Sequence, residues 1–260
     1  MSGAPGKGAP APGTPGAGPR GPELPGEVRE VAAALIAFLG DNLRALIWHG
    51  SWARGEQTAE SDHDMIVVVG QLDDETIRGL EEVFRGRSSW STYVKTEPEL
   101  RQYPLTGRLQ FHHGAIVLYG GIDAPPVTRE GLIEDLRRTA IDVQHECRYR
   151  VIHGSGGGMY EGMDPAYARI RTARWMYYQS KLALMALKAR EVLRGKSYPL
   201  TRNELRRRLT DEHELAIVDT IDFWPELRPG FEEDVTPLAL QLDALMRKLV
   251  SELDGAEQPQ

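Results

Sequence analysis

Apolar positions in the first half of the chain follow a helical spacing in some segments and form short strand-like runs in others. From Glu27 they recur every three or four residues, as on one face of a helix, and Gly40 can end that helix. Runs rich in β-branched, aromatic and aliphatic residues predict four strands, at 43–48, 64–69, 90–96 and 114–120. A helical pattern at 74–85 separates the second and third runs. This order predicts a small unit in which helices pack on a sheet.

After Pro126 the pattern changes to long helical stretches with charged faces. The predicted helices and their signals are 129–153 capped by Thr128, 165–194 ended by Gly195, a start at 202 with a capping box of Thr201 and Glu204, and 237–253 with Thr236 as cap and Pro237 at the first position. The run GSGGG at 154–158 breaks the chain between the first two. These signals predict a helical domain.

Together the patterns predict an α+β protein, with a small mixed-sheet domain at 25–126 followed by an all-α helical-bundle domain at 127–254. Residues 1–24 are mostly Gly, Pro and Ala with almost nothing to bury, so we expect a disordered tail there, and a second short tail at 255–260.

Composition excludes several classes of function. The 260 residues are 41% hydrophobic and 27% charged, which is ordinary globular material, and the net charge of -7 disfavours nucleic acid and anionic membranes as partners. Cys147 is the only cysteine, so we expect it to be a buried or half-buried thiol in a reducing compartment. The sequence has no stretch of about 18 apolar residues and no signal peptide, which predicts a cytoplasmic protein without membrane contact.

Two aspartates stand one residue apart where the second predicted strand begins, in SDHDMIVVV at 61–69. Because alternate side chains share a face of a strand, Asp62 and Asp64 should point the same way. Two such carboxylates repel each other unless a cation lies between them. Mg²⁺ is the natural candidate, since it takes one or two protein carboxylates and completes its shell with water and substrate phosphates.

A turn upstream supplies the second half of a phosphate site, in HGSWARG at 49–55. Gly50 lets the backbone approach a phosphate, Ser51 offers a hydroxyl, and Arg54 lies nearby. A Gly-Ser pair alone is usually a simple turn, and an Asp-x-Asp alone is usually a solvated loop or strand end. Their combination at this spacing is much more specific, and it indicates a nucleoside triphosphate between the turn and a metal. It is not a P-loop, because no Gly-Lys-Ser/Thr follows.

These two motifs resemble those of the nucleotidyltransferase superfamily that shares the fold of DNA polymerase beta. The stretch WSTYVKTEPELRQYPLTGRLQFHHGAIVLYGG at 90–121 is similar to the kanamycin-type aminoglycoside nucleotidyltransferases, and the whole likeness covers about 27–250. The resemblance implies that Gly50 and Ser51 hold the triphosphate and that Asp62 and Asp64 bind catalytic Mg²⁺. It also implies a homodimer with the site near the interface.

One position departs from the family. The resemblance implies a third carboxylate on the strand at 90–96, on the face of the aspartate pair, and the motif places Thr92 there with Ser91 beside it. Glu97 and Glu99 lie past the strand and fit better as the first turn of a helix. Loss of the third carboxylate would leave nucleotide binding largely intact and weaken activation of the attacking hydroxyl.

The general base should come from the first long helix, as in the resembling enzymes. Glu146 is our first candidate and Asp142 the second, although a solvated charged face explains both equally well. On that same helix Arg138 and His145 stand at a spacing similar to the ribonuclease motif of helical HEPN domains. We regard this similarity as weaker, because Thr139 replaces the usual polar residue after the arginine.

Other polar residues are candidates for contacts with the nucleotide. One of His112 and His113, after a strand-like aromatic run, can face it, but adjacent residues of a strand cannot both do so. The second long helix carries a row of residues that we interpret as its solvent-exposed face, with Lys181 as the exception that binds phosphate: Arg171, Arg174, Tyr178, Lys181 and Lys188.

The favoured function is a magnesium-dependent transferase that moves AMP from ATP onto a small-molecule acceptor, such as an aminoglycoside hydroxyl, and releases pyrophosphate. A second hypothesis is a degenerate nucleotide-binding relative that acts as a sensor or protein partner, in a toxin-antitoxin or biosynthetic setting. A third is a ligase that forms an acyl-adenylate. The sequence does not separate the first from the third.

Overall fold

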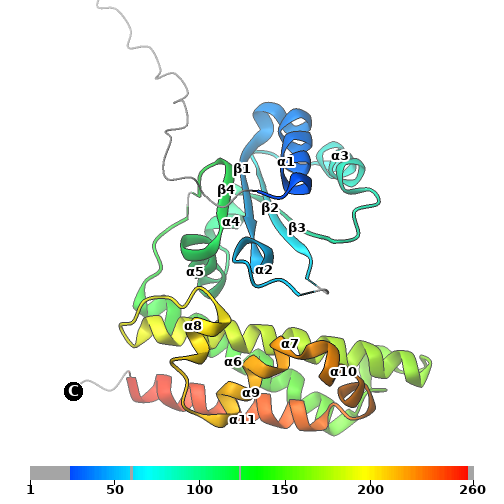
Figure 1. The fold of residues 1–260 in the computed structure, drawn as a ribbon, viewed down its shortest axis with the longest axis vertical. Coiled ribbons are helices and arrows are strands. Elements are labelled where there is room, and N and C mark those ends of the chain that lie inside the picture. The colour runs from blue at the N-terminus through cyan, green and yellow to red at the C-terminus, as the bar shows by residue number, and fades with distance from the viewer. Residues whose placement is uncertain (1–23, 59–60, 123, 257–260) are drawn as a thin grey trace, which may run out of the picture.

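The computed structural model describes residues 24–58, 61–122 and 124–256. The predicted tail at 1–24 lies outside this range except for Leu24, and so do residues 257–260 of the predicted C-terminal tail. Figure 1 shows a sheet with its helices stacked on a layer of long helices. This arrangement confirms the predicted α+β architecture, a mixed sheet followed by an all-helical region.

The sheet has four strands in the order β3-β2-β1-β4, and all four were predicted: β1 Leu43–His49, β2 His63–Val69, β3 Trp90–Thr96 and β4 Ile116–Gly120. β1 runs antiparallel to β2 and β4, whereas β2 and β3 are parallel. The sheet is therefore mixed. Its two middle strands are almost wholly buried, because apolar residues on both of their faces meet helices.

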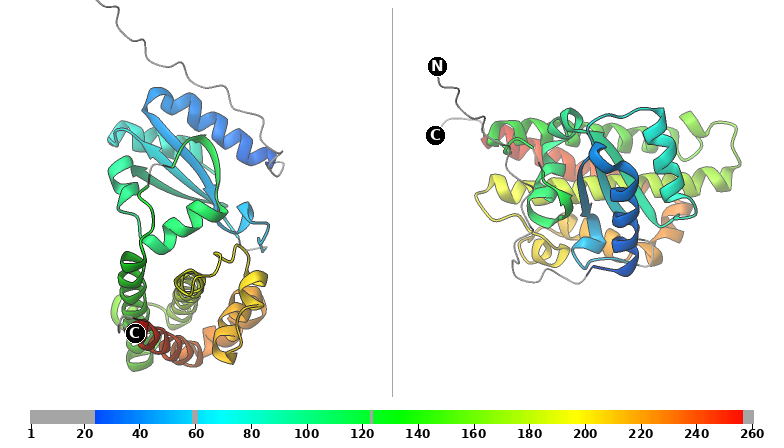
Figure 2. Two further views of the ribbon diagram at one scale, coloured as in Figure 1. Left: turned by 90° about the vertical axis from the view of Figure 1, so that its left-hand side faces the viewer. Right: turned by 90° about the horizontal axis from the view of Figure 1, so that it is seen from above.

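Helices cover both faces of the sheet (Figure 2). On one face α1 (Gly26–Leu39) and α3 (Asp74–Phe84) pack on apolar side chains of β1 and β2, and a short 3₁₀ turn (Gly40–Asn42) links α1 to β1. On the other face α4 (Glu97–Arg101) and α5 (Leu105–Gly114) contribute Leu100 and Phe111 to a smaller core. A one-turn helix, α2 (Gly50–Ala53), follows β1 directly.

The interpretation of the aromatic run before His112 and His113 as strand-like is wrong, since both histidines lie on α5. That helix is buried on two sides, because Leu109 packs into the helical core and Phe111 packs on the sheet. Because apolar residues lie on two faces of α5, its sequence lacks the single apolar stripe by which a helix is usually recognised.

The helical region is built on two long helices, α6 and α7. Its elements are α6 (Arg129–His153), a 3₁₀ turn (Gly158–Tyr160), α7 (Pro165–Leu193), α8 (Arg202–Arg206), α9 (Glu212–Asp222), α10 (Trp224–Glu233) and α11 (Thr236–Ala256). The predicted caps Thr128 and Thr201 accept backbone N–H groups of their helices. Thr236 was predicted to cap the last helix, but it is the first residue of that helix, so the helix begins one residue earlier than predicted. The helix also continues into the predicted C-terminal tail. Helices α9 and α10 were not predicted.

The burial expected of Cys147 is confirmed by the structure. Cys147 is buried in the helical core, and its pKa is raised to about 12, chiefly by burial. Among the described helices, none is both long enough and apolar enough to cross a membrane.

Candidate active site

The turn and the aspartates meet at one edge of the sheet. His49, the last residue of β1, pairs with Asp64 of β2, and Gly50 and Ser51 follow in the first turn of α2. Asp62 is exposed and immediately precedes β2. Antiparallel pairing of β1 and β2 thus brings together two motifs that are more than ten residues apart in the sequence.

Gly50 and Asp64 are in direct contact. Gly50 has a φ of 80°, in the left-handed region that favours glycine. A Cβ atom added there would overlap the carboxylate oxygen Oδ2 of Asp64. The carboxylate therefore lies against bare backbone at the start of α2, and any side chain at position 50 would have to displace it.

The environment of Asp64 disfavours its negative charge. The pKa of Asp64 is raised from 3.8 to about 6, chiefly by burial and also by the charge of Asp62, although Lys181 and Arg54 act to lower it. The two aspartates are thus close enough to repel each other, as the strand pattern predicted. The charge of Lys181 on α7 acts on this carboxylate, while its Nζ lies 4.7 Å from the centroid of the Tyr177 ring.

Arg54 belongs to a network that joins the turn to the helical region. Its Nε lies 3.0 Å from Glu56 Oε2, and its Nη1 lies 3.5 Å from Gln110 Oε1. The Glu56 carboxylate also accepts the backbone N–H of Arg202, and the Glu56 carbonyl accepts that guanidinium at 2.8 Å. Glu56 therefore fixes the residues that follow α2 against α8.

Two histidines that the sequence did not mark as site residues support the site from within the sheet. His63, between the aspartates but on the opposite face, stacks on Trp52 at 4.5 Å and Trp90 at 4.9 Å between ring centroids. His49 lies edge-on to Phe111 at 5.5 Å, and burial lowers its pKa to about 4, so it is neutral at pH 7. The sequence signal for His63 was the alternation of side chains along a strand, which places His63 on the face opposite Asp64, toward the core.

Glu146, the candidate base, contacts α7. Its Oε2 accepts the indole N–H of Trp175 at 2.8 Å and lies 3.9 Å from the guanidinium of Arg150. Asp142 is exposed one turn earlier on α6. Arg138 is exposed and pairs with Glu134 at 3.7 Å. The roles predicted for these residues stay predictions.

Comparisons with known proteins give structural likenesses but no match of sequence families. No protein-family model matches the sequence, and no curated protein matches it either. Among solved structures, a spectinomycin adenyltransferase AAD(9) from Enterococcus faecialis, with ATP and spectinomycin, is similar at 15% identity, covering 86% of this chain and 98% of that one, with a TM-score of 0.49. A toxin-antitoxin with AMP-PNP is similar at 18% identity over 46% of this chain and 94% of that one, with a TM-score of 0.26. Both TM-scores are below 0.5, so the assignment of function depends on the site itself.

The placement of Thr92 on the face of the aspartate pair is wrong. In the parallel pairing of β2 and β3, Asp64 is opposite Ser91, whereas Thr92 is opposite Met65. Side chains directly across a sheet share a face, so Thr92 points to the α1 side, where its hydroxyl is buried without a hydrogen-bond partner. The residue that faces Asp64 from β3 is Ser91. Glu99 caps α4 through Thr96, as the helix interpretation predicted.

Thr92→Val is expected to leave nucleotide turnover within about two-fold of wild type and to stabilise the protein by about 1 kcal/mol, because it removes an unpaired buried hydroxyl. Urea unfolding and an activity assay check both parts. Ser91→Val, on the adjacent residue that faces Asp64, is the matched control and should lower activity. A large loss of turnover in Thr92→Val alone would return Thr92 to the site.

The predicted polar row on α7 divides into exposed and buried members. Arg171, Arg174 and Lys181 are exposed. Lys188 is buried, donates to the Leu200 carbonyl at 2.7 Å, and has its pKa lowered to about 8, chiefly by burial. Its interpretation as part of the solvent face is therefore wrong, because the segment before α8 covers this end of α7.

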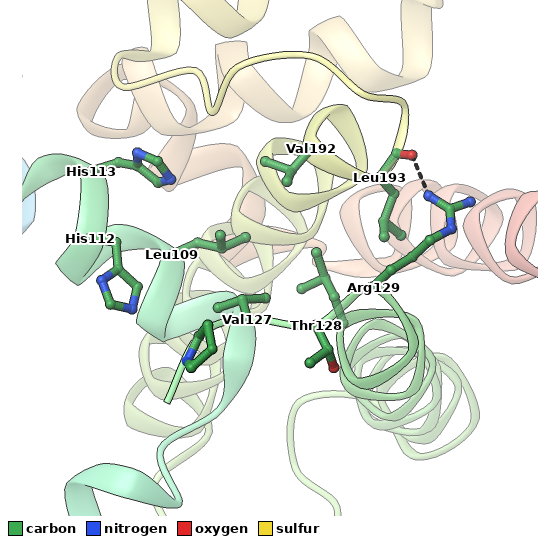
Figure 3. Close-up of a pocket in the computed structure, with 10 residues that line it drawn as sticks. Leu109, His112, His113, Val127, Thr128, Arg129, Val192 and Leu193 are labelled. Carbon is green, nitrogen blue, oxygen red and sulfur yellow. Dashed lines mark hydrogen bonds between the residues drawn. The ribbon is translucent and has the colours of Figure 1, made fainter. Parts of the chain in front are cut away.

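A separate pocket of about 450 Å³ lies between α5, the start of α6 and the end of α7 (Figure 3). His112, His113 and apolar residues line it, and Arg129 donates to the Leu193 carbonyl at 2.7 Å across one side. The lining includes none of the glycine, serine or aspartate residues predicted to bind nucleotide.

Proposed function

We propose that the chain is a magnesium-dependent nucleotidyltransferase that moves a nucleoside monophosphate, AMP from ATP in the simplest case, onto a small-molecule acceptor. One observation carries the proposal: the desolvated carboxylate of Asp64 lies against the bare backbone of Gly50, beside Asp62 and within electrostatic reach of Lys181 and Arg54. Carboxylates, a glycine-serine turn and cations are what a metal-bound triphosphate requires.

The residues fit a magnesium ion. The raised pKa of Asp64 shows that its charge has too few compensating partners, and a divalent cation supplies the missing positive charge. Within the described residues, no group of three or more histidine, cysteine, aspartate or glutamate side chains could hold a metal. Asp62 and Asp64 would therefore hold the ion as a pair, with triphosphate oxygens and water as its other ligands. When bound, it would neutralise both the carboxylates and the phosphates.

The remaining residues position the triphosphate. The backbone around Gly50 and the Ser51 hydroxyl can bind nonbridging oxygens, and Lys181 offsets their charge from the α7 side. The acceptor oxygen then forms a bond to the α-phosphorus, the bond from that phosphorus to the α,β-bridging oxygen breaks, and pyrophosphate leaves with the electron pair.

Glu146→Gln is expected to lower turnover by roughly 10²–10⁴-fold without changing ATP affinity, since it removes the base but can still accept the Trp175 N–H. Initial rates of pyrophosphate release and calorimetric titration with ATP separate the two effects. Glu134→Gln, at an exposed position of the same helix, is the control. Normal turnover in Glu146→Gln would remove Glu146 from this role.

One observation favours a second candidate, a nucleotide-binding protein that acts as a sensor or partner. Ser91 and Tyr93, the β3 residues on the Asp64 side, provide no third carboxylate. Such a protein would bind ATP with Mg²⁺ and release no pyrophosphate with any acceptor.

The test of the transferase proposal is release of pyrophosphate from labelled ATP with Mg²⁺ and a panel of aminoglycosides and other alcohols, amines and acids, with Asp62→Ala as the blank. Release that requires both Asp62 and one acceptor supports it, and a carboxylic acid as that acceptor would indicate the ligase variant. ATP binding without release under every condition supports the sensor. Light scattering of the same preparation tests the homodimer.

A further inference from the structure

Large aromatic side chains gather beside the proposed site without being buried. Tyr93 is 41% exposed, Trp175 38% and Tyr178 46%. Tyr103 is half-buried next to them, and its pKa is raised to about 12, chiefly by burial and also by Tyr93, Tyr178 and Asp64, which places these groups close together. These four residues are called the aromatic platform below.

The aromatic platform combines residues of the sheet region with residues of the helical region. Tyr93 is on the Asp64 side of β3, because the pairing of Asp64 with Ser91 sends alternate residues to that side. Tyr103 packs on Phe111 at 5.0 Å between ring centroids, and Phe111 contacts His49, the strand partner of Asp64.

On α7 the residues three apart from Trp175 through Tyr178 to Lys181 lie along one face. The rings of Trp175 and Tyr178 stack at 5.6 Å, and Lys181 is the residue whose charge reaches Asp64. The two stacked rings therefore lie within two turns of a residue whose charge acts on Asp64.

The Trp175 ring is held in place although water can reach it. The Trp175 indole N–H donates to Glu146, which fixes the ring plane. Single exposed aromatic residues are normal on protein surfaces, but several exposed rings near carboxylates, two of them stacked and one fixed by a hydrogen bond, indicate a binding surface.

The strand order indicates which reactant this surface meets. The triphosphate turn follows β1, the aspartates lie on β2, and Tyr93 lies on β3 at the other side of β2. In an in-line reaction the attacking oxygen enters opposite the leaving pyrophosphate. With pyrophosphate over the β1 side, the acceptor enters from the β3 side, where the platform lies.

Charges of both signs lie around the site. Lys181 and Arg54 are the cations that act on Asp64, and Arg54 is paired with Glu56. Asp62 and Asp64 are assigned to the metal, and Glu146 accepts the indole N–H of Trp175. We propose that the acceptor is a small molecule with a flat ring that carries the reacting hydroxyl and stacks on Tyr178 and Trp175. This inference rests on the proposed function. The hydroxyl oxygen bonds to the α-phosphorus, pyrophosphate leaves, and the hydroxyl proton passes to Glu146.

The test measures binding of a matched pair of alcohols to the full chain by saturation-transfer NMR: 2-phenylethanol and its saturated counterpart 2-cyclohexylethanol. The aromatic alcohol should bind about five-fold tighter, and Tyr178→Ala should weaken it by about ten-fold. Tyr119→Ala, at a 40% exposed tyrosine on the opposite edge strand, should leave it unchanged. ATP affinity should be unaffected in both variants.

Equal binding of the two alcohols, or tighter binding of kanamycin than of either, would overturn the inference. So would a loss of ATP affinity in Tyr178→Ala with alcohol binding intact, since the platform would then stack the nucleotide base. The alcohols are titrated without nucleotide, so a wild-type protein that fails to bind ATP with Mg²⁺ would contradict the proposed function separately.

Discussion

Asp64→Asn is expected to abolish nucleotide transfer and at the same time to stabilise the metal-free protein. Turnover should fall by roughly 10³-fold or more, because the neutral amide no longer holds the cation that offsets the phosphate charge. The pKa of Asp64 is raised to about 6 in the folded chain from 3.8, so folding disfavours the ionised form. The penalty is absent below pH 4, grows between pH 4 and 6, and is complete above pH 6.

Urea unfolding in EDTA measures this effect. At pH 8 Asp64→Asn should be more stable than wild type by about 2 kcal/mol, a value reduced from the full shift because the side chain is partly exposed, and at pH 4 the two should coincide. Asp73→Asn is the control of opposite sign, since the pKa of Asp73 is lowered by the N–H of Thr76. Destabilisation by Asp64→Asn at pH 8 would mean that the carboxylate serves the fold.

Gly50→Ala is expected to cost about 2–5 kcal/mol of stability and to eliminate ATP binding. The added methyl group would overlap Asp64 Oδ2, and alanine is strained at a φ of 80°. Thermal unfolding and ATP titration give both quantities.

Gly55→Ala separates the cost of backbone strain at a positive φ from the cost of steric overlap with Asp64. Gly55 has a φ of 69° with nothing near the added methyl group, so this variant should lose only the backbone term of about 1 kcal/mol. Combining Gly50→Ala with Asp64→Ala should recover the packing part of the loss, because the two residues are in contact. A Gly50→Ala variant as stable as Gly55→Ala would contradict the contact.

The sequence predicted the regular elements better than the short or doubly buried ones. All four strands, α1, α3, α6 and α7 follow from apolar periodicity and capping residues. Helix α5 was missed because it is buried on two sides. Helices α9 and α10 are short, and α10 carries Pro225, Pro229 and Gly230, which usually break a helical pattern.

The sequence predicted the parts of the site that depend on short motifs. It did not predict the parts that depend on packing against another strand or segment. The approach of Asp62 and Asp64 to Gly50 follows from one hairpin-like pairing. The orientation of Thr92 depends on the register between β2 and β3, which no residue in either strand reveals. Lys181 and Lys188 look alike on the helix, but only the second lies beneath the segment before α8, so their different burial is a tertiary effect.

The most direct measurement of the central claim is calorimetric titration of ATP into wild type and Asp62→Asn, each with Mg²⁺ and with EDTA. Binding by wild type that requires Mg²⁺ and is lost or greatly weakened in Asp62→Asn is the predicted result. ATP binding that is the same with EDTA, or unchanged in Asp62→Asn, would contradict a triphosphate site built on the aspartate pair.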